Sequence, residues 1–402
     1  MMLRVLWVVL LVVLARAGDV SAQVRVTKGA GEKSSIDWNA FGAAGDPASQ
    51  TFITTLTGDL LRSGWFKRGT PGASEFALTG SVAAQGSLRV EATVYGRVAA
   101  RQVFGKAYTG DPATARRLAH TVADEIIEAL TGRKGISSAR IALVGTRTGK
   151  KELYLCDADG QGLIQLTRDN SISIGPNWSP DGRQLVYTSF MKGFADVFKI
   201  DLSSGGRSRL AHFSGLNTGA SISPNGRDVA LILSKDGNPE LYVMNIGGGG
   251  LVRLTNTRRA GEASPSWSPD GSRIVYVSDQ AGTPQLYMVS RSGGEPRRLT
   301  SRGSQNVAPD WGRNNVIAFS SLFGGRWNIC VMDPDSLAVK QITNGDADYE
   351  DPSWAPDGRH LAAGRGLKYQ SKVYLLDTMG DPPIALTDYP KDWYSPAWEP
   401  SR

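Results

Sequence analysis

The chain has 402 residues, more than a single hydrophobic core usually serves, so two or more domains are expected. Its 45 Lys and Arg residues outnumber its 38 Asp and Glu residues only slightly, which gives a formal net charge of +7. The basic residues are scattered and do not form the stripe or arm that phosphate binding requires. Binding to nucleic acid is therefore not expected.

The first 22 residues show the pattern of a cleaved secretory signal peptide. Arg4 supplies a positive charge, residues 5–14 form an unbroken apolar run, and Val-Ser-Ala at 20–22 gives the small residues that a signal peptidase reads. An uncleaved anchor is the alternative, but this run is too short to cross a membrane. Cleavage would leave Gln23 as the mature N-terminus. No later segment approaches the length of a membrane span, so no membrane insertion is expected.

Residues 23–34 are expected to form a flexible segment, followed by a compact α/β domain at 35–134. Asp46 and Pro47 predict a helix start, because Asp caps free backbone N–H groups and Pro fits the first turn. Apolar residues at helical spacing follow, and the predicted helix ends near Gly64.

The rest of this domain is predicted to hold three strands and a second helix. Alternating apolar residues place the strands at 76–82, 88–94 and 103–108. Asp111 and Pro112 predict the start of the second helix, and Gly132 stands where a C-terminal cap glycine belongs. Residues 132–138 read as a linker.

The second part of the chain repeats with a period near 44 residues, which is typical of propellers and solenoids. The repeat is marked by a bulky residue at Trp178, Ile222, Trp267, Trp311, Trp354 and Trp398. Variants of Ser-Pro-Asp-Gly, a tight-turn sequence, follow four of these residues, at 179–182, 223–226, 268–271 and 355–358. Three further strands recur at the same period, so each unit is predicted to be a four-stranded blade.

The phase of the repeat predicts how the ring closes. The first unit lacks a Trp strand ahead of it, whereas the chain ends with one, at Trp398. The C-terminal strand is therefore expected to complete the first blade, which hides sheet edges that would invite aggregation. The predicted architecture is an α/β domain followed by a six-bladed β-propeller at 139–402.

The sequence contains no recognisable catalytic or metal-binding motif. Its three histidines, His120, His212 and His360, are not spaced as metal ligands, and no Gly-x-Ser-x-Gly occurs. We therefore assign no catalytic residues, no metal ligands and no cofactor. A divalent cation in the propeller tunnel is compatible with the fold but is not predicted.

Two short patterns resemble functional motifs, but in both a structural role is favoured. Residues 157–160, Asp-Ala-Asp-Gly, begin like a calcium loop, but Arg168 occupies the position of the final acidic ligand, so a polar turn is favoured. Cys156 and Cys330 fall in blades one and five, too far apart for a disulfide, and are expected to be buried free thiols.

The loops ahead of the six Trp strands should emerge on one face of the propeller, around the tunnel. These loops are 168–174, 214–219, 258–264, 301–307, 344–351 and 388–394. They carry amides, carboxylates and aromatic residues, which suits recognition of a polypeptide. Solvated turns without a partner are the alternative, but binding concentrates on exposed loops of rigid scaffolds.

Several motifs resemble the TolB family of the Tol-Pal cell-envelope system. The most specific are Ser-Asp-Gln-Ala-Gly-Thr-Pro-Gln-Leu-Tyr at 278–287 and Gly-Ser-Gln-Asn at 303–306. Leu-Thr-Gly-Arg-Lys-Gly at 130–135 is similar to the family's domain junction. The order of signal, α/β domain and six blades also resembles this family.

The resemblance implies a monomeric, non-enzymatic adaptor in the periplasm that supports outer-membrane integrity and constriction during cell division. It implies binding of the peptidoglycan-associated lipoprotein Pal through the loop face, at Asn217, Thr218, Gly219, Glu262, Ala263, Ser264, Gln305, Asn306, Tyr349 and Glu350. It also implies that the C-terminal domain of TolA binds Gln23, Val24, Arg25, Val26 and Thr27. The alternating Val-Arg-Val suits addition of a strand to a sheet edge.

Two other functions fit a propeller. A polysaccharide lyase would need His, Arg or carboxylates clustered at the tunnel mouth, and the three histidines are spread along the chain. A glycan-binding propeller would repeat one aromatic-and-acid pocket per blade, whereas the loops differ from blade to blade.

Overall fold

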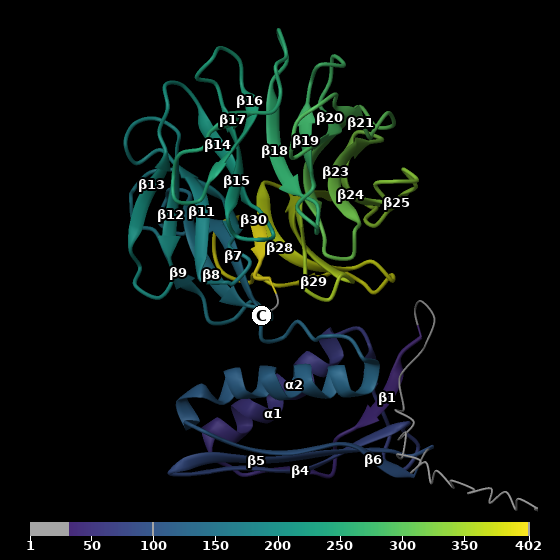
Figure 1. Cartoon of the computed structure of the whole chain (residues 1–402). Helices are drawn as coiled ribbons and strands as arrows, with labels where there is room; N and C mark the ends of the chain where they lie inside the picture. Colours follow the sequence, from purple (N-terminus) through teal and green to yellow (C-terminus); the bar gives the residue numbers. More distant parts are fainter. Residues whose placement is uncertain (1–31, 99, 401–402) are drawn as a thin grey trace, which may run out of the picture.

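The computed structural model describes residues 32–98 and 100–400, which form an α/β domain and a propeller (Figure 1). In the first domain one sheet has the order β3-β1-β4-β5-β6, with β2 paired to β4. Its strands are β1 (Ser34–Asp37), β2 (Phe41–Ala43), β3 (Phe66–Arg68), β4 (Phe76–Gln85), β5 (Ser87–Gly96) and β6 (Arg101–Gly110). Helices α1 (Pro47–Arg62) and α2 (Ala115–Thr131) lie between this sheet and the propeller (Figure 1).

The ends of the helices follow the predicted caps, with one difference. The Asp46 side chain accepts a hydrogen bond from the backbone N–H of Ser49 at the start of α1. Gly132 ends α2 in the left-handed conformation, at φ 69°. The second helix does not begin at Pro112 as an α-helix, because a 3-10 turn, η1 (Pro112–Thr114), precedes α2. Asp111 caps that turn instead.

The remaining described strands form six four-stranded sheets, which confirms the predicted blades. The inner strands are β10 (Ser173–Trp178), β14 (Asn217–Ile222), β18 (Glu262–Trp267), β22 (Gln305–Trp311), β26 (Asp348–Trp354) and β30 (Trp393–Trp398). The second strands are β11 (Gln184–Ser189), β15 (Asp228–Leu233), β19 (Arg273–Ser278), β23 (Ile317–Phe323), β27 (His360–Leu367) and β7 (Arg140–Gly145). The third strands are β12 (Asp196–Asp201), β16 (Glu240–Asn245), β20 (Gln285–Ser290), β24 (Arg326–Met332), β28 (Gln370–Asp377) and β8 (Glu152–Asp157). The outer strands are β13 (Arg207–Ala211), β17 (Val252–Arg253), β21 (Arg297–Arg298), β25 (Val339–Gln341), β29 (Ile384–Ala385) and β9 (Ile164–Gln165).

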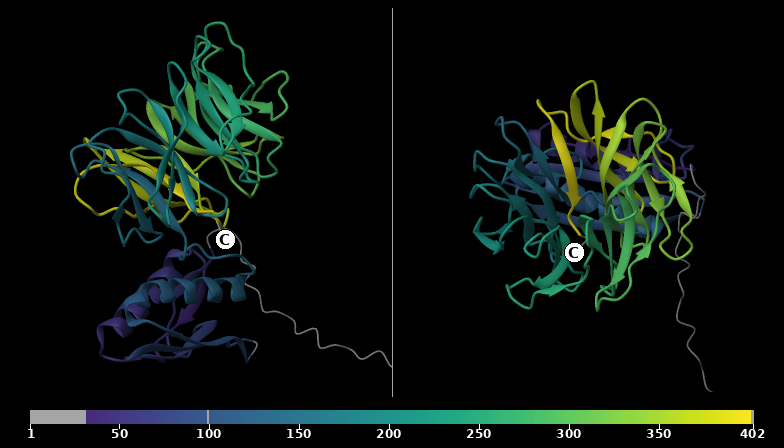
Figure 2. Two further views of the ribbon diagram at one scale, coloured as in Figure 1. Left: turned by 60° about the vertical axis from the view of Figure 1, so that its left-hand side comes forward. Right: turned by 90° about the horizontal axis from the view of Figure 1, so that it is seen from above.

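The ring closes as the phase of the repeat predicts. The C-terminal strand β30 pairs with β7, so the first blade has the order β30-β7-β8-β9 (Figure 2). Neighbouring inner strands contact each other around the whole ring. Their C-terminal ends are joined by hydrogen bonds between blades, such as Trp354 N–H to Asp310 Oδ2 at 2.7 Å and Trp398 N–H to Ser353 Oγ at 3.0 Å.

The blades pack through apolar faces, and both cysteines lie in this packing. Cys156 and Cys330 are buried free thiols in blades one and five, as expected. Burial raises the pKa of Cys330 to about 11, so this side chain is a neutral thiol. Within the described residues no helix is long and apolar enough to cross a membrane. The predicted signal peptide at 1–22 lies outside them.

Candidate functional site

Each inner strand contains a bulge at the same place, just inside the loop face. One residue per blade takes a positive φ: Gly175, Gly219, Ser264, Ala308, Asp351 and Ser395. The pairing register with the second strand shifts across each of these positions. Four of the six are not glycine, and a positive φ is uncommon for such residues. The bulges bend all six strands at the tunnel mouth and fix how the preceding loops leave the blades.

The loop face lies at the end of the propeller away from the α/β domain. A cleft of about 540 Å³ between the two domains is lined by residues of α2 and by Pro356, Glu399 and Pro400. These last three residues follow the C-terminal ends of inner strands. The loops that precede the inner strands therefore emerge at the opposite, open end of the ring.

Four of the ten predicted Pal-binding residues have buried side chains beneath this face: Asn217, Glu262, Asn306 and Tyr349. Asn217 Oδ1 accepts from the N–H of Phe213 at 2.8 Å, and its Nδ2 donates to the Phe213 carbonyl at 2.8 Å. Asn306 Nδ2 donates to the Arg302 carbonyl at 2.8 Å and to Gln285 Oε1 at 2.9 Å. These amides hold the loops in shape from below.

Glu262 is the most perturbed of these buried groups. Burial is the main cause that raises its pKa to about 7, and the neighbouring charge of Glu240 adds to it, while hydrogen bonds from Ser278 and Thr257 oppose it. Thr257 Oγ1 lies 3.3 Å from Glu262 Oε1 and 3.1 Å from Glu240 Oε1, so it links the two carboxyl groups. Among the described residues Glu262 Oε2 has no hydrogen-bond partner. The Glu262 carboxyl therefore changes charge near neutral pH.

The other six predicted residues are accessible at the tunnel mouth. Ala263, Ser264 and Glu350 are exposed, whereas Thr218, Gly219 and Gln305 are half-buried. Burial, followed by the charges of Asp351 and Asp348, raises the pKa of Glu350. The predicted set thus divides into an accessible layer and a supporting layer. The TolA-binding residues predicted at 23–27 lie outside the described residues.

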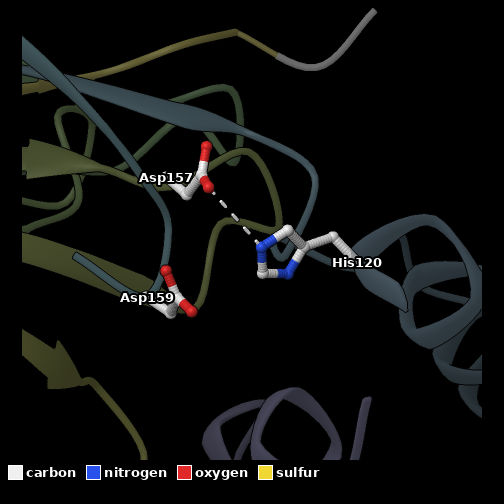
Figure 3. A group of neighbouring side chains, drawn as sticks. All are labelled: His120, Asp157 and Asp159. Carbon is white, nitrogen blue, oxygen red and sulfur yellow. Dashed lines mark ion pairs between the residues drawn. The ribbon is translucent and has the colours of Figure 1, made fainter. Parts of the chain in front are cut away.

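A second polar cluster joins the two domains (Figure 3). His120 projects from α2, and its Nε2 lies 3.8 Å from Oδ2 of Asp157, the last residue of β8. Its Nδ1 lies 2.6 Å from Asp59 Oδ2 on α1. Arg116 Nη2 donates to both oxygens of Asp159 at 2.9 Å and to Asp157 Oδ2 at 3.2 Å.

The carboxylates of this cluster face two basic side chains, Arg116 and His120. His120, Asp157 and Asp159 offer ligand atoms within 4.8 Å of one another. Burial lowers the pKa of His120, but the hydrogen bonds of Asp157 and Asp59 outweigh it and raise the pKa to about 9. A protonated imidazole and the Arg116 guanidinium therefore already occupy the positions facing the carboxylates. Through these charged hydrogen bonds the cluster holds α1 and α2 of the first domain against blade one.

A further contact between the domains involves blade six. Arg359 Nη2 donates to the Gly64 carbonyl at 3.1 Å, and its guanidinium lies over the Trp65 ring at 4.6 Å. Its Nε also donates to Asp377 Oδ1 at 3.0 Å. A side chain at Gly64, where φ is 71°, would come within 2.5 Å of Arg359 Nη2, so this contact requires glycine.

Local sequence signals did not reveal these interdomain pairs. The residues after β8 do form a turn, since the N–H of Gly160 donates to the Asp157 carbonyl at 2.8 Å, and their carboxylates additionally hold α2. Of the three histidines, His212 is exposed, whereas His120 and His360 are buried. A capping or spacing rule reaches only a few residues, whereas Arg359 and Gly64 are 295 residues apart.

The fold and this face define a class: a six-bladed β-propeller protein with an α/β domain ahead of the ring and an open loop face behind it. A family profile, the TolB beta propeller domain, matches residues 127–402. The chain belongs to the TolB β-propeller family. The resemblance inferred from the motifs is thereby confirmed.

Individual relatives match shorter stretches. A Tol-Pal system protein TolB from Desulfosudis oleivorans is 39% identical over 126 residues, which cover 31% of this chain and 29% of that protein. One from Geobacter metallireducens is 38% identical over 112 residues, covering 28% and 25%. The matches thus span less than a third of these relatives. The structure of TolB from Acinetobacter baumannii shares the fold at a TM-score of 0.82 and 24% identity, over 93% of this chain and 98% of that one.

Proposed function

We propose that this protein is a non-enzymatic, periplasmic adaptor of the Tol-Pal system. The loop face binds the soluble domain of Pal, and residues 23–27 bind the C-terminal domain of TolA. Through these contacts the protein supports outer-membrane integrity and constriction during division. Family membership and the names of the curated relatives support this assignment.

One observation carries the proposal: all six inner strands are bulged at the same place and contact one another around the ring, so the loops ahead of them emerge together at the open end of the propeller. Strained backbone positions that recur at one mouth are typical of binding sites. The residues there include small polar groups and a carboxylate, Glu350, whose raised pKa reflects partial desolvation and neighbouring acidic groups. Such a rim suits a folded protein partner better than one repeated sugar unit.

The test is calorimetric titration of the chain from Gln23 with the soluble domain of Pal from the same organism. Glu350→Ala changes an exposed group at the face, and Glu295→Ala is the matched control, because Glu295 is exposed in the turn after β20 at the opposite end. We expect tight binding that Glu350→Ala weakens several-fold and Glu295→Ala leaves unchanged. No binding to the folded wild-type chain would reject the Pal assignment and favour a glycan-binding propeller.

The TolA contact is tested separately. The chain from Gln23 and a chain beginning at residue 32 are titrated with the C-terminal domain of TolA. Binding that requires residues 23–31 supports strand addition by this segment. Equal binding by both chains would place the TolA contact elsewhere.

A further inference from the structure

Blade five differs from the other five blades at one core position. The third strand of each blade carries an aromatic residue opposite the middle of the second strand: Tyr154, Phe198, Tyr242, Tyr287 and Tyr374. In blade five this position is Cys330, opposite Phe319. Where two rings meet at this position they pack together, as Tyr187 and Phe198 do with centroids 5.9 Å apart.

The small side chain leaves a slot between blades four and five. A cavity of about 530 Å³ is lined by Leu299, Phe319, Cys330, Leu337 and Val339, among others. This volume lies within the range of sites that bury a small ligand or a large side chain. A thiol with a raised pKa contributes an apolar floor.

One end of the slot lies at the loop face. Ser301, Arg302 and Gly303, from the loop ahead of β22, line it together with Phe323. Phe323 ends β23, and an antiparallel neighbour ends where β22 begins, so this residue lies at the same end of the propeller as the loop face. Phe323 is 61% exposed, and Val339, which also lines the slot, is 54% exposed.

The mouth of the slot is basic. Arg302 is exposed, and within residues 32–98 and 100–400 no ion pair engages its guanidinium. Arg298, on the outer strand of blade four, donates through Nε to the carbonyl of Thr300, which also lines the slot. A slot with an apolar floor, polar walls and the Arg302 guanidinium at its rim is complementary to a large apolar side chain beside a carboxylate.

We propose that this slot receives a large apolar side chain, preferably aromatic, flanked by a carboxylate on the polypeptide that binds the loop face. The inference rests on the proposed function for its partner and adds a specific anchor to it. Cys330 keeps the slot open, Phe319 and Leu299 contact the inserted side chain, and Arg302 pairs with the adjacent carboxylate.

Two substitutions of Cys330 distinguish an effect of the open slot from an effect of the thiol group. Cys330→Phe restores the aromatic residue that Phe198 supplies in blade two, so the new ring should stack on Phe319 and leave the melting temperature equal or higher. Cys330→Ala keeps the slot open without the thiol. Titration with the soluble Pal domain should show binding about 10- to 100-fold weaker for Cys330→Phe, the loss expected when an apolar side chain can no longer be buried. Cys330→Ala should bind like the wild type, and Arg302→Gln should weaken binding in low salt.

A small probe keeps failure of the slot distinct from failure of the Pal assignment. Phenylacetate, an aromatic ring with a carboxylate, is titrated into each variant and followed by chemical shifts in protein NMR. Binding to the wild type and Cys330→Ala, but not to Cys330→Phe, supports the slot. Pal binding that is equal for the wild type and Cys330→Phe overturns the inference. If Pal binds none of the proteins, Pal is rejected as the partner. The phenylacetate result then decides alone whether the slot binds an aromatic carboxylate.

Discussion

Replacing Glu262 with Gln should remove a pH-dependent loss of stability from the propeller. The folded state raises the pKa of this buried carboxyl from 4.5 to about 7. A native group that holds its proton more tightly than the unfolded chain stabilises fully below pH 4.5, and this contribution is lost as the pH rises through 7. The shift corresponds to an upper bound of about 3 kcal/mol well above pH 7. The amide introduced by Glu262→Gln would keep an oxygen acceptor for Thr257 without the charge.

The assay is thermal unfolding of both proteins from pH 5 to pH 8.5. At about 2 °C per kcal/mol for a domain of this size, Glu262→Gln should melt about 5 °C above the wild type at pH 8.5 and nearly with it at pH 5. Glu295→Gln, at an exposed site, should show no such dependence. A difference for Glu262→Gln that is constant across this pH range would refute the assigned protonation of Glu262.

Two further substitutions test the turn and the domain interface. Gly160→Ala should destabilise the chain by about 3 kcal/mol or more, because φ is 80° and the new Cβ would lie 1.7 Å from the Leu386 carbonyl oxygen; Gly149→Ala, with no atom within 4 Å of its Cβ, controls for the positive φ in urea unfolding. His120→Gln should lower stability by up to about 3 kcal/mol near pH 6.5 and lose that effect as the pH rises through 9, since protonated His120 stabilises the folded state below this pKa. Equal losses at pH 6.5 and pH 10 would contradict the charged pairing with Asp59.

The repeated part of the fold could be predicted from the sequence because similar residues recur at the same positions in successive blades. A Trp ends five of the six inner strands, and a variant of the Ser-Pro-Asp-Gly turn follows four of them, so these local signals recur from blade to blade. The unpaired first unit and the final Trp398 were sufficient to predict that β30 closes the ring. The Asp46 cap and Gly132 likewise act within their own helices.

The sequence did not predict in this way which of the candidate site residues are buried and which are exposed. Alternation along a strand predicts which face a residue takes, but each inner strand bends at a bulge, and at Ser264 and Asp351 the bulge residue is not glycine. Local propensity therefore does not predict that the side chains of Asn217 and Glu262 are buried beneath the loop face while that of Glu350 is exposed. Interdomain pairs such as Arg116 with Asp159 depend on how two domains dock, which no local pattern encodes.

The slot in blade five shows what the sequence can predict and what it cannot. The sequence aligned Cys330 with five aromatic residues, so the exception itself was visible in the repeat. Its consequence depends on packing, because a small side chain can be compensated by neighbours that move inward. The structure leaves the volume unfilled and places Arg302 at its edge.

The central claim, that the loop face binds a folded partner, is tested most directly by hydrogen exchange measured with and without the soluble Pal domain. The account predicts slower exchange in the loops at 214–219, 258–264 and 301–307, with little change in the turns at the opposite end of the ring. Protection confined to that opposite end, or to the α/β domain, would contradict it.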